Sequence, residues 1–553
     1  MKRILFLILV LFVAGACLDD KSNYDYRDIN NYDDNKWKIT GIGGEYSLFP
    51  GESITLTPVV RLSMDTLNPD VEGHWLLDGI EVATGPSYTF EATEYGEYNL
   101  VYLATDKKTG VSFPAEADIQ VAPPYKFGWL FLSRTASGNS HLSLLAGKKT
   151  VLNPDDYATR RDSLIYVDFY TNLGETLLGT GPIKLIEEFA FPGENLTLPS
   201  EVMILQESGP IELGGYELDF TGSPLNEFVG EKPNLKIKNA VLGWSSKWLQ
   251  TDDNQLYFSV SKVLTDLHSG RYSDDPAFNG AKYETLVEGQ TAGDSYSVSD
   301  VILAIDETNT MWALVNDGSE KSYGDGLMDP RNKIGARARL KNNSSGSFDM
   351  TLFNNFTGRY VKHLLVHSNK YFLSLLERDG KYLWHKYLIE VDRSYTVGSE
   401  IAVTSSKTGV LAAEMFTDFK DAAFVKGRNT AYEDTEWLFV ASGNKLYGTV
   451  MKWDEGLVSK DFFTAREDIV SIKARYFYNS LANDSSNKYI HLGVLLVDGT
   501  FLVLEVNYDA NSATFTTKTI FDKNLKQLDP NIVEVVDMIH KYGAGTNTDG
   551  YLN

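Results

Sequence analysis

The sequence predicts an all-β fold, and three observations support this prediction. The 553 residues include 31 tyrosines, 28 phenylalanines and 9 tryptophans, and such flat side chains pack well on the pleated surface of a sheet. Segments that alternate apolar and polar residues recur along the chain, whereas strong helical periodicity is scarce. The chain is also too long for one ordinary domain, so we expect two or more units, or one large repeat fold.

Residues 1–16 are typical of a signal peptide. Lys2 and Arg3 precede the apolar run 4–13, and the small residues 14–16 follow it. A run this short does not cross a hydrocarbon core of ~30 Å comfortably, so it indicates an export signal rather than a membrane span. No later stretch reaches about 18 apolar residues, the length that a spanning helix needs.

Cys17 is the single cysteine of the chain and directly follows the small residues. An exported chain with one cysteine can form no internal disulfide. The segment resembles a bacterial lipoprotein signal, in which the cysteine is diacylated and becomes residue one, although leucine is commoner in that family where Ala14 stands. The resemblance implies that Cys17 is the lipid attachment site and that outer-membrane lipid is a partner. The alternative is an ordinary cleavage site with an accidental cysteine.

Residues 17–38 are interpreted as an acidic, flexible tether, since they contain few apolar residues that could order them. Asp19 and Asp20 stand just after the cysteine. This arrangement resembles the acidic export signal of Bacteroidetes surface lipoproteins, which implies an outer-membrane protein that faces the cell exterior. The alternative is that the acidic residues belong only to a soluble spacer.

Residues 39–122 are predicted to form a small β domain. The segment 53–62 alternates as a half-buried strand should, and Asp78-Gly79 predicts a type I′ hairpin turn. Together with Trp75 and with Gly96, Tyr98 and Asp106, this turn resembles the PKD-like, immunoglobulin-like sandwich. The resemblance implies that Trp75 fills the core between two sheets and that the domain is a spacer or adhesive module.

Residues 125–553 follow the Pro123-Pro124 joint and repeat a pattern of apolar strand, polar turn and aromatic second strand. Candidate hairpins start near residues 128, 202, 255, 301, 363, 437 and 490, about 60 residues apart. Such a unit must stack on its neighbours, and a closed β-propeller leaves only short edges. We therefore predict a propeller, with seven blades as the preferred count and six or eight as alternatives. Residues 531–543 are ambiguous and are a candidate for the closing strand.

The order of these parts resembles the PKD-like family lipoproteins of Bacteroidetes. That resemblance implies a place beside a TonB-dependent channel and a SusD-like lipoprotein, and capture of a glycan or peptide polymer at the cell surface.

The sequence contains no recognised catalytic motif. The net charge is −24, which disfavours nucleic acid as a partner, and the hydrolase, nucleotide and cysteine-metal signatures are missing. His363 and His367 are interpreted as structural, and Glu187-Glu188 point to opposite faces of a strand. We therefore predict no catalytic residue, no metal site and no cofactor.

The strongest candidate for ligand binding is the segment 244–283. It contains Trp244 and Trp248, followed by a polar insertion with His268, Arg271, Tyr272, Phe278 and Tyr283. Flat aromatic and hydrogen-bonding side chains on a loop suit sugars or peptides. The alternative is that the tryptophans pack between blades.

The preferred prediction is a non-catalytic surface lipoprotein. It would bind a nutrient polymer, or dock on the complex of the TonB-dependent channel and the SusD-like lipoprotein. One alternative is a propeller hydrolase of glycans or peptides, which requires a pocket with convergent carboxylates. The other is a purely structural subunit of the complex, which requires a large apolar patch.

Overall fold

The computed structural model divides the chain into two compact units, Met1–Val121 with Thr150–Arg160, and Ala122–Lys149 with Arg161–Asn553. The residues that it describes are 30, 38–63, 69–125, 128–151, 160–168, 178–189, 197–198, 200–230, 234–242, 246–260, 266–287, 301–317, 334–343, 346–366, 369–389, 400–428, 434–451, 460–475, 489–509, 512–541 and 545–546. Within them nearly all regular structure is strand, as the composition predicts, and no helix is long and apolar enough to cross a membrane.

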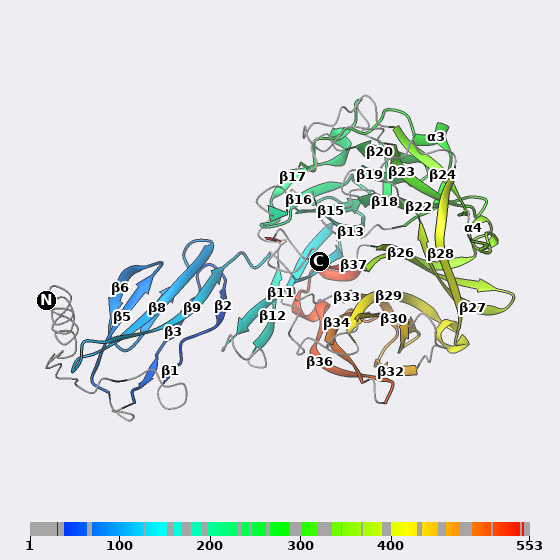
Figure 1. The fold of residues 1–553 in the computed structure, drawn as a ribbon. Coiled ribbons are helices and arrows are strands. Elements are labelled where there is room, and N and C mark those ends of the chain that lie inside the picture. The colour runs from blue at the N-terminus through cyan, green and yellow to red at the C-terminus, as the bar shows by residue number, and fades with distance from the viewer. Residues whose placement is uncertain are drawn as a thin grey trace, which may run out of the picture. The chain divides into compact units, whose positions relative to one another are not determined.

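The first unit is a sandwich of β-strands (Figure 1). Its larger sheet has the order β2-β9-β8-β5-β6, and the short pairs β3-β7 and β1-β4 share its core. The strands are β1 (Lys38–Thr40), β2 (Glu45–Leu48), β3 (Ser53–Leu56), β4 (Val59–Arg61), β5 (Val71–Leu77), β6 (Ile80–Thr84), β7 (Tyr88–Glu91), β8 (Gly96–Asp106) and β9 (Ser112–Val121). The segment 53–62, predicted as one strand, is thus divided between β3 and β4.

Trp75 forms the centre of this sandwich, as predicted. Its side chain is fully buried, packs 4.7 Å from the ring of Tyr102, and donates from its indole nitrogen to the carbonyl of Gly85. Asp78 and Gly79 have φ values of 50° and 81°, the positive values that a type I′ turn requires. The turn prediction is therefore confirmed, and it fixes the register of β5 against β6.

The second unit is propeller-like: its strands form successive antiparallel sets of three or four. The sets are β37 (Ile532–Lys541), β10 (Gly128–Thr135), β11 (Ser140–Val151) and β12 (Arg160–Asp168); β13 (Pro182–Phe189), β15 (Ser200–Gln206), β16 (Ile211–Gly214) and β17 (Phe220–Gly222); β18 (Ile237–Leu242), β19 (Ser246–Thr251) and β20 (Leu256–Val260); β21 (Tyr283–Leu286), β22 (Val301–Asp306), β23 (Met311–Asp317) and β24 (Ile334–Asn342); β25 (Gly358–Val366), β26 (Asn369–Arg378), β27 (Lys381–Ile389) and β28 (Glu400–Leu411); β29 (Phe419–Arg428), β30 (Asp434–Ser442), β31 (Lys445–Met451) and β32 (Lys460–Thr464); and β33 (Ile469–Arg475), β34 (Tyr489–Leu496), β35 (Thr500–Asp509) and β36 (Thr514–Asn524).

Further strand pairings and five short helices complete the described elements. β24 and β28 pair in parallel and join their two sets, and β14 (Thr197–Leu198) pairs with β38 (Gly545–Thr546). The helices are η2 (Pro224–Glu227), α3 (Ala277–Gly280), α4 (Thr351–Asn354), η4 (Ala413–Phe416) and α5 (Leu525–Leu528).

Hydrophobic cores form between successive sets, which is how a propeller buries its sheets. Leu249 of β19 packs with Met203 of β15 on one side of its sheet, and Trp248 of the same strand packs with Leu314 of β23 on the other. In Figure 1 the sheets of this unit follow one another around a common centre.

β37 closes the ring, because it pairs along its length with β10, the first strand of the unit. Residues 531–543 are thus the closing strand that the sequence left ambiguous. The blade count of seven stays a prediction.

Candidate functional site

The residues predicted from sequence to bind lipid, export machinery or ligand are only partly described by the structure. Cys17, Asp19, Asp20 and Trp244 lie outside the described residues, as does His367. Trp248, Arg271, Tyr272 and Phe278, which were predicted to bind a ligand, are all among the described residues.

Trp248 and Tyr272 lie in the hydrophobic core. Trp248 is 1% exposed and stacks on Phe258 and Phe278, with ring centroids 5.3 and 5.9 Å away. Tyr272 is fully buried and stacks on Phe228 at 5.0 Å. Their aromatic faces are used for packing between strands, so they anchor the segment 266–287 rather than offer a surface to a ligand.

Arg271 and Phe278 are the members of the predicted set that reach the surface. Arg271 is exposed, and its guanidinium donates to the carbonyls of Gly270 and His268 at 3.2 and 3.5 Å. Phe278 is half-buried, has a φ of 57°, and lies 5.4 Å below the guanidinium of Arg337. The polar contacts and the turn therefore hold this part of the segment in one shape.

A buried cluster of charged side chains fastens the same segment to two sheets. Glu201 is the second residue of β15, and Glu212 lies on β16. Glu212 faces Met203 across the ladder, so the two carboxylates share one face of the sheet as diagonal neighbours. Glu227 ends η2, whose first turn is capped by the hydroxyl of Ser223.

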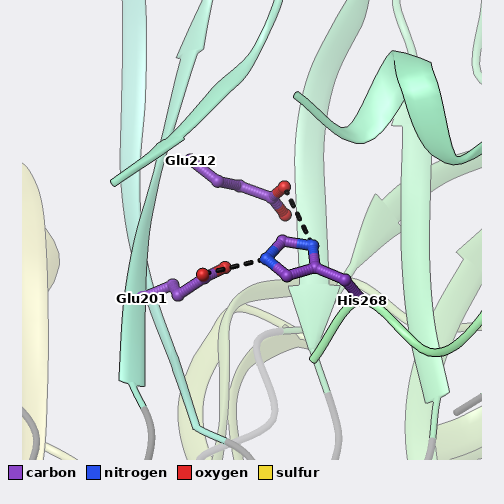
Figure 2. Close-up of side chains that lie close together, drawn as sticks. All are labelled: Glu201, Glu212 and His268. Atoms are coloured by element: carbon purple, nitrogen blue, oxygen red, sulfur yellow. Dashed lines mark hydrogen bonds and ion pairs between the residues drawn. The ribbon is translucent and has the colours of Figure 1, made fainter. Parts of the chain in front are cut away.

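His268 lies between these carboxylates. Its Nδ1 is 2.5 Å from Glu227 Oε1 and its Nε2 is 2.9 Å from Glu201 Oε1, while Glu212 Oε2 is 3.8 Å from Nδ1 (Figure 2). Both ring nitrogens face acceptors, so both must carry a proton to donate. The hydrogen bonds to Glu201 and Glu227 raise the pKa of His268 to about 10, against the opposing effect of burial.

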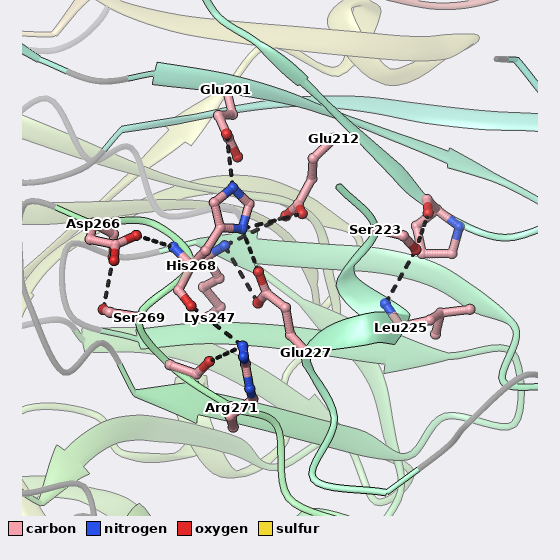
Figure 3. A network of polar contacts seen from close by, with 12 residues as sticks. Glu201, Glu212, Ser223, Leu225, Glu227, Lys247, Asp266, His268, Ser269 and Arg271 are labelled. Carbon is pink, nitrogen blue, oxygen red and sulfur yellow. Dashed lines mark hydrogen bonds and ion pairs between the residues drawn. The ribbon is translucent and has the colours of Figure 1, made fainter. Parts of the chain in front are cut away.

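Lys247 of β19 supplies the second cation of the cluster. Its Nζ lies 3.5 Å from Glu212 Oε1 and 3.8 Å from Glu227 Oε2 (Figure 3). The side chains of Glu212, Lys247 and Glu227 are 0%, 4% and 6% exposed, whereas that of His268 is 36% exposed. The cluster is therefore closed on the sheet side and open on the side of His268.

Backbone hydrogen bonds also join the segment 266–287 to the residues at the end of η2. The amide of Tyr272 donates to the carbonyl of Glu227 at 2.9 Å, and the amide of Val229 donates to the carbonyl of Tyr272 at 3.1 Å. The amide of His268 donates to Asp266 Oδ1 at 2.9 Å. These hydrogen bonds and the charged cluster can together hold the polar segment 266–287 in a fixed shape. Glu201, Glu212 and His268 also each offer one atom that could bind a metal ion, and these three atoms lie within 4.8 Å of one another.

Sequence reasoning placed His268 in the binding segment but missed its carboxylate partners. One signal was present, because Glu201 and Glu212 interrupt the apolar hairpin 201–214, where a buried charge requires a partner. The identity of that partner, 56 residues beyond Glu212, could not be read from spacing because it depends on how two neighbouring sheets pack.

Comparisons with solved structures find distant similarities. One is a quinonprotein alcohol dehydrogenase-like protein from Bacteroides thetaiotaomicron, at 10% identity and a TM-score of 0.23, covering 77% of this chain and 96% of that one. Another is Prp20p from Saccharomyces cerevisiae, at 10% identity and a TM-score of 0.35, covering 71% and 86%. The Dos1 propeller gives 10% identity and a TM-score of 0.27, covering 62% and 87%. Similarities this distant say nothing about activity.

No curated protein matches the chain. A family model does match its N-terminal part, over residues 17–163, and that model describes the PKD-like family. The match includes the sandwich built around Trp75. The chain therefore carries a PKD-like family domain at its N-terminus, ahead of a propeller-like unit.

Proposed function

We propose that this protein is a non-catalytic, lipid-anchored protein of the outer-membrane surface, and that its propeller-like unit binds a glycan or peptide polymer. Cys17 carries the lipid, and Asp19 and Asp20 direct the chain to the outer face. A PKD-like domain followed by a propeller-like unit fits a binding or accessory role, and the PKD-like domain acts as the spacer.

The observation that carries this proposal is the fixed polar segment 266–287. Its exposed residues are mostly polar or charged, and they include Arg271, Asn279 and Lys282. Such groups suit the hydroxyls of a sugar or the backbone of a peptide. Because the ion cluster and the buried aromatic rings already hold the segment, binding loses little conformational entropy. A TonB-dependent channel and a SusD-like lipoprotein are the partners we propose for uptake.

The test is a binding assay of the full chain against panels of polysaccharides and peptides, together with purification from outer membranes. We expect one polymer class to bind, and Arg271→Ala to weaken that binding about tenfold, the effect of losing roughly 1.4 kcal/mol. Arg466→Ala is the matched control, since Arg466 is also exposed but lies between β32 and β33. Its binding should equal that of the unchanged protein.

Two results would contradict the proposal. A chain that purifies alone and binds no polymer has no binding role of this kind. A chain that releases product from a polymer is a hydrolase instead.

A further inference from the structure

We propose that Glu201, Glu212 and His268 form a binding site for a divalent first-row transition-metal cation, with Zn²⁺ as the probe. The inference does not rest on the proposed polymer binding, and it departs from the sequence-based expectation of no metal site. An imidazole with two carboxylates is a donor set that zinc and its neighbours accept, whereas magnesium and calcium prefer oxygen ligands alone.

The spacing of the three side chains suits one ion. Each offers one ligand atom, and these atoms lie within 4.8 Å of one another. Around a tetrahedral zinc, with bonds of about 2.0–2.2 Å, ligand atoms stand roughly 3.3 Å apart. Glu201 lies beside Nε2 of His268, whereas the 3.8 Å contact of Glu212 is to Nδ1. Side-chain rotations of Glu212 and His268 therefore have to bring the three atoms onto one ion, while the strands that carry Glu201 and Glu212 stay in place.

The charge balance of the cluster also favours a cation. Among the five side chains of the cluster there are three carboxylates, those of Glu201, Glu212 and Glu227, and two cations, His268 and Lys247. Lys247 Nζ stands 3.5 and 3.8 Å from the nearest carboxylate oxygens, longer than the ~2.7–2.9 Å of a charge-assisted hydrogen bond.

Glu201 adds an independent indication that a ligand belongs here. The residue is 7% exposed, and its Oε2 is buried with no hydrogen-bond partner. Figure 2 shows its carboxylate directed at the ring of His268. A buried carboxylate oxygen without a donor is costly, and a metal ion between Glu201 and His268 would satisfy it.

Glu227 then has a separate part in the site. Its Oε1 lies 2.5 Å from Nδ1 of His268, which leaves Nε2, beside Glu201, as the nitrogen for the metal. The metal takes the place of the Nε2 proton, which is released to solvent. A ligating histidine commonly donates its other ring N–H to a carboxylate, which fixes the ring and its tautomer. Glu227 is therefore a positioning residue. The exposed side of His268 provides the entry path that a metal site needs.

The experiment titrates ZnCl₂ into the EDTA-treated full chain by calorimetry. We expect one equivalent to bind, and Glu201→Gln, Glu212→Gln and His268→Gln each to weaken that binding at least tenfold. The glutamine variants of the two glutamates keep the shape of the side chain and remove only its charge. Glu207→Gln is the matched control, because Glu207 is exposed at the turn after β15, and it should bind as the unchanged chain does.

A second measurement covers the case in which a variant fails to fold. Co²⁺ added to the unchanged chain should give visible absorption bands of a bound ion, and one equivalent of Zn²⁺ should remove them. The proposal is overturned if the unchanged chain takes up no stoichiometric zinc and gives no cobalt bands, which would leave the cluster as an ion-pair network alone. It is equally overturned if all variants bind zinc as tightly as the unchanged chain.

Discussion

His268 and His385 are held in opposite electrostatic surroundings. Carboxylates on both sides of His268 raise its pKa to about 10, whereas burial lowers the pKa of His385 to about 3. His385 is 1% exposed on β27, packs 4.9 Å from the ring of Phe353, and shares a 2.8 Å hydrogen bond with the hydroxyl of Ser406. The folded protein therefore keeps His385 neutral where an unfolded chain would protonate it.

The first prediction concerns the acid sensitivity that His385 confers. Its folded pKa lies below the unfolded value of ~6.5, so its contribution to stability is present above that pH and is lost as the pH falls towards 3. Between pH 6.5 and 5.0 the loss is roughly 2 kcal/mol, at ~1.4 kcal/mol per pH unit. Urea unfolding of the unchanged protein and of His385→Gln should be measured at pH 7.5 and 5.0. Between these two pH values the free energy of unfolding of the unchanged protein should fall by about that much more than that of His385→Gln.

Ser406→Ala is the control for this measurement. It removes the hydrogen bond but leaves the titrating ring, so its pH dependence should stay that of the unchanged protein. Equal slopes for the unchanged protein and His385→Gln would show that the ring does not account for the acid sensitivity.

At the scale of elements, the closing strand is the feature with the largest consequence. β37 pairs with β10, and Asp537 on β37 also accepts a 2.9 Å hydrogen bond from the amide of Leu185 on β13. One strand thus completes the first set and binds the next. Met538 of β37 belongs to the hydrophobic core that contains Trp129 and Phe501. Removing β37 would therefore expose the apolar side chains of this core.

We predict that deleting residues 532–553 prevents the C-terminal unit from folding, because β10 loses its partner and the core around Trp129 opens. Circular dichroism and limited proteolysis should show loss of that unit's cooperative unfolding. Deleting only residues 547–553, beyond the last described strand, is the control and should leave unfolding unchanged. A stable C-terminal unit in the longer deletion would show that ring closure is dispensable.

The elements that the sequence predicts best are those marked by a few neighbouring residues, such as a turn dipeptide. The turn at Asp78-Gly79 needs only two residues to specify its backbone, and the hairpin 301–317 is marked by an apolar run on each side of a polar turn. Most of the predicted hairpins lie where their polar turns placed them. The turns and apolar runs of these hairpins are therefore enough to predict an all-β fold built from stacked hairpins.

β19 shows where that information ends. All six of its residues are buried, so it has no polar face and no alternation to read. The sequence consequently places Trp248 in a predicted binding segment and marks only the second strand of its hairpin, β20. The carboxylate cluster was missed for a related reason, because it assembles from β15, β16, η2 and a distant segment only after the sheets have packed.

At the scale of the whole molecule, the proposed anchor gives a test that does not depend on any ligand. Cys17→Ala should leave the protein without lipid, because no other thiol exists in the chain, and should move it from the membrane fraction to the soluble fraction. Labelling with a radioactive fatty acid and fractionation measure this. Label and membrane association that persist in Cys17→Ala would refute the anchor.

The two acidic residues after the anchor separate anchoring from orientation. Asp19→Ala with Asp20→Ala should keep the lipid but reduce the access of protease to the protein on whole cells. Unchanged access would mean that these carboxylates do not direct the chain outward, while the anchor itself would stand.

The pairing of β37 with β10 also sets an order in time. The ion pair between Arg134 on β10 and Glu534 on β37 spans 400 residues of chain, so β10 is synthesised long before its partner. Contacts at such separation form late in folding. The ring can close only after nearly the whole chain has been made. A chain still being synthesised therefore stays incompletely folded, which is the state in which a polypeptide can be threaded across a membrane.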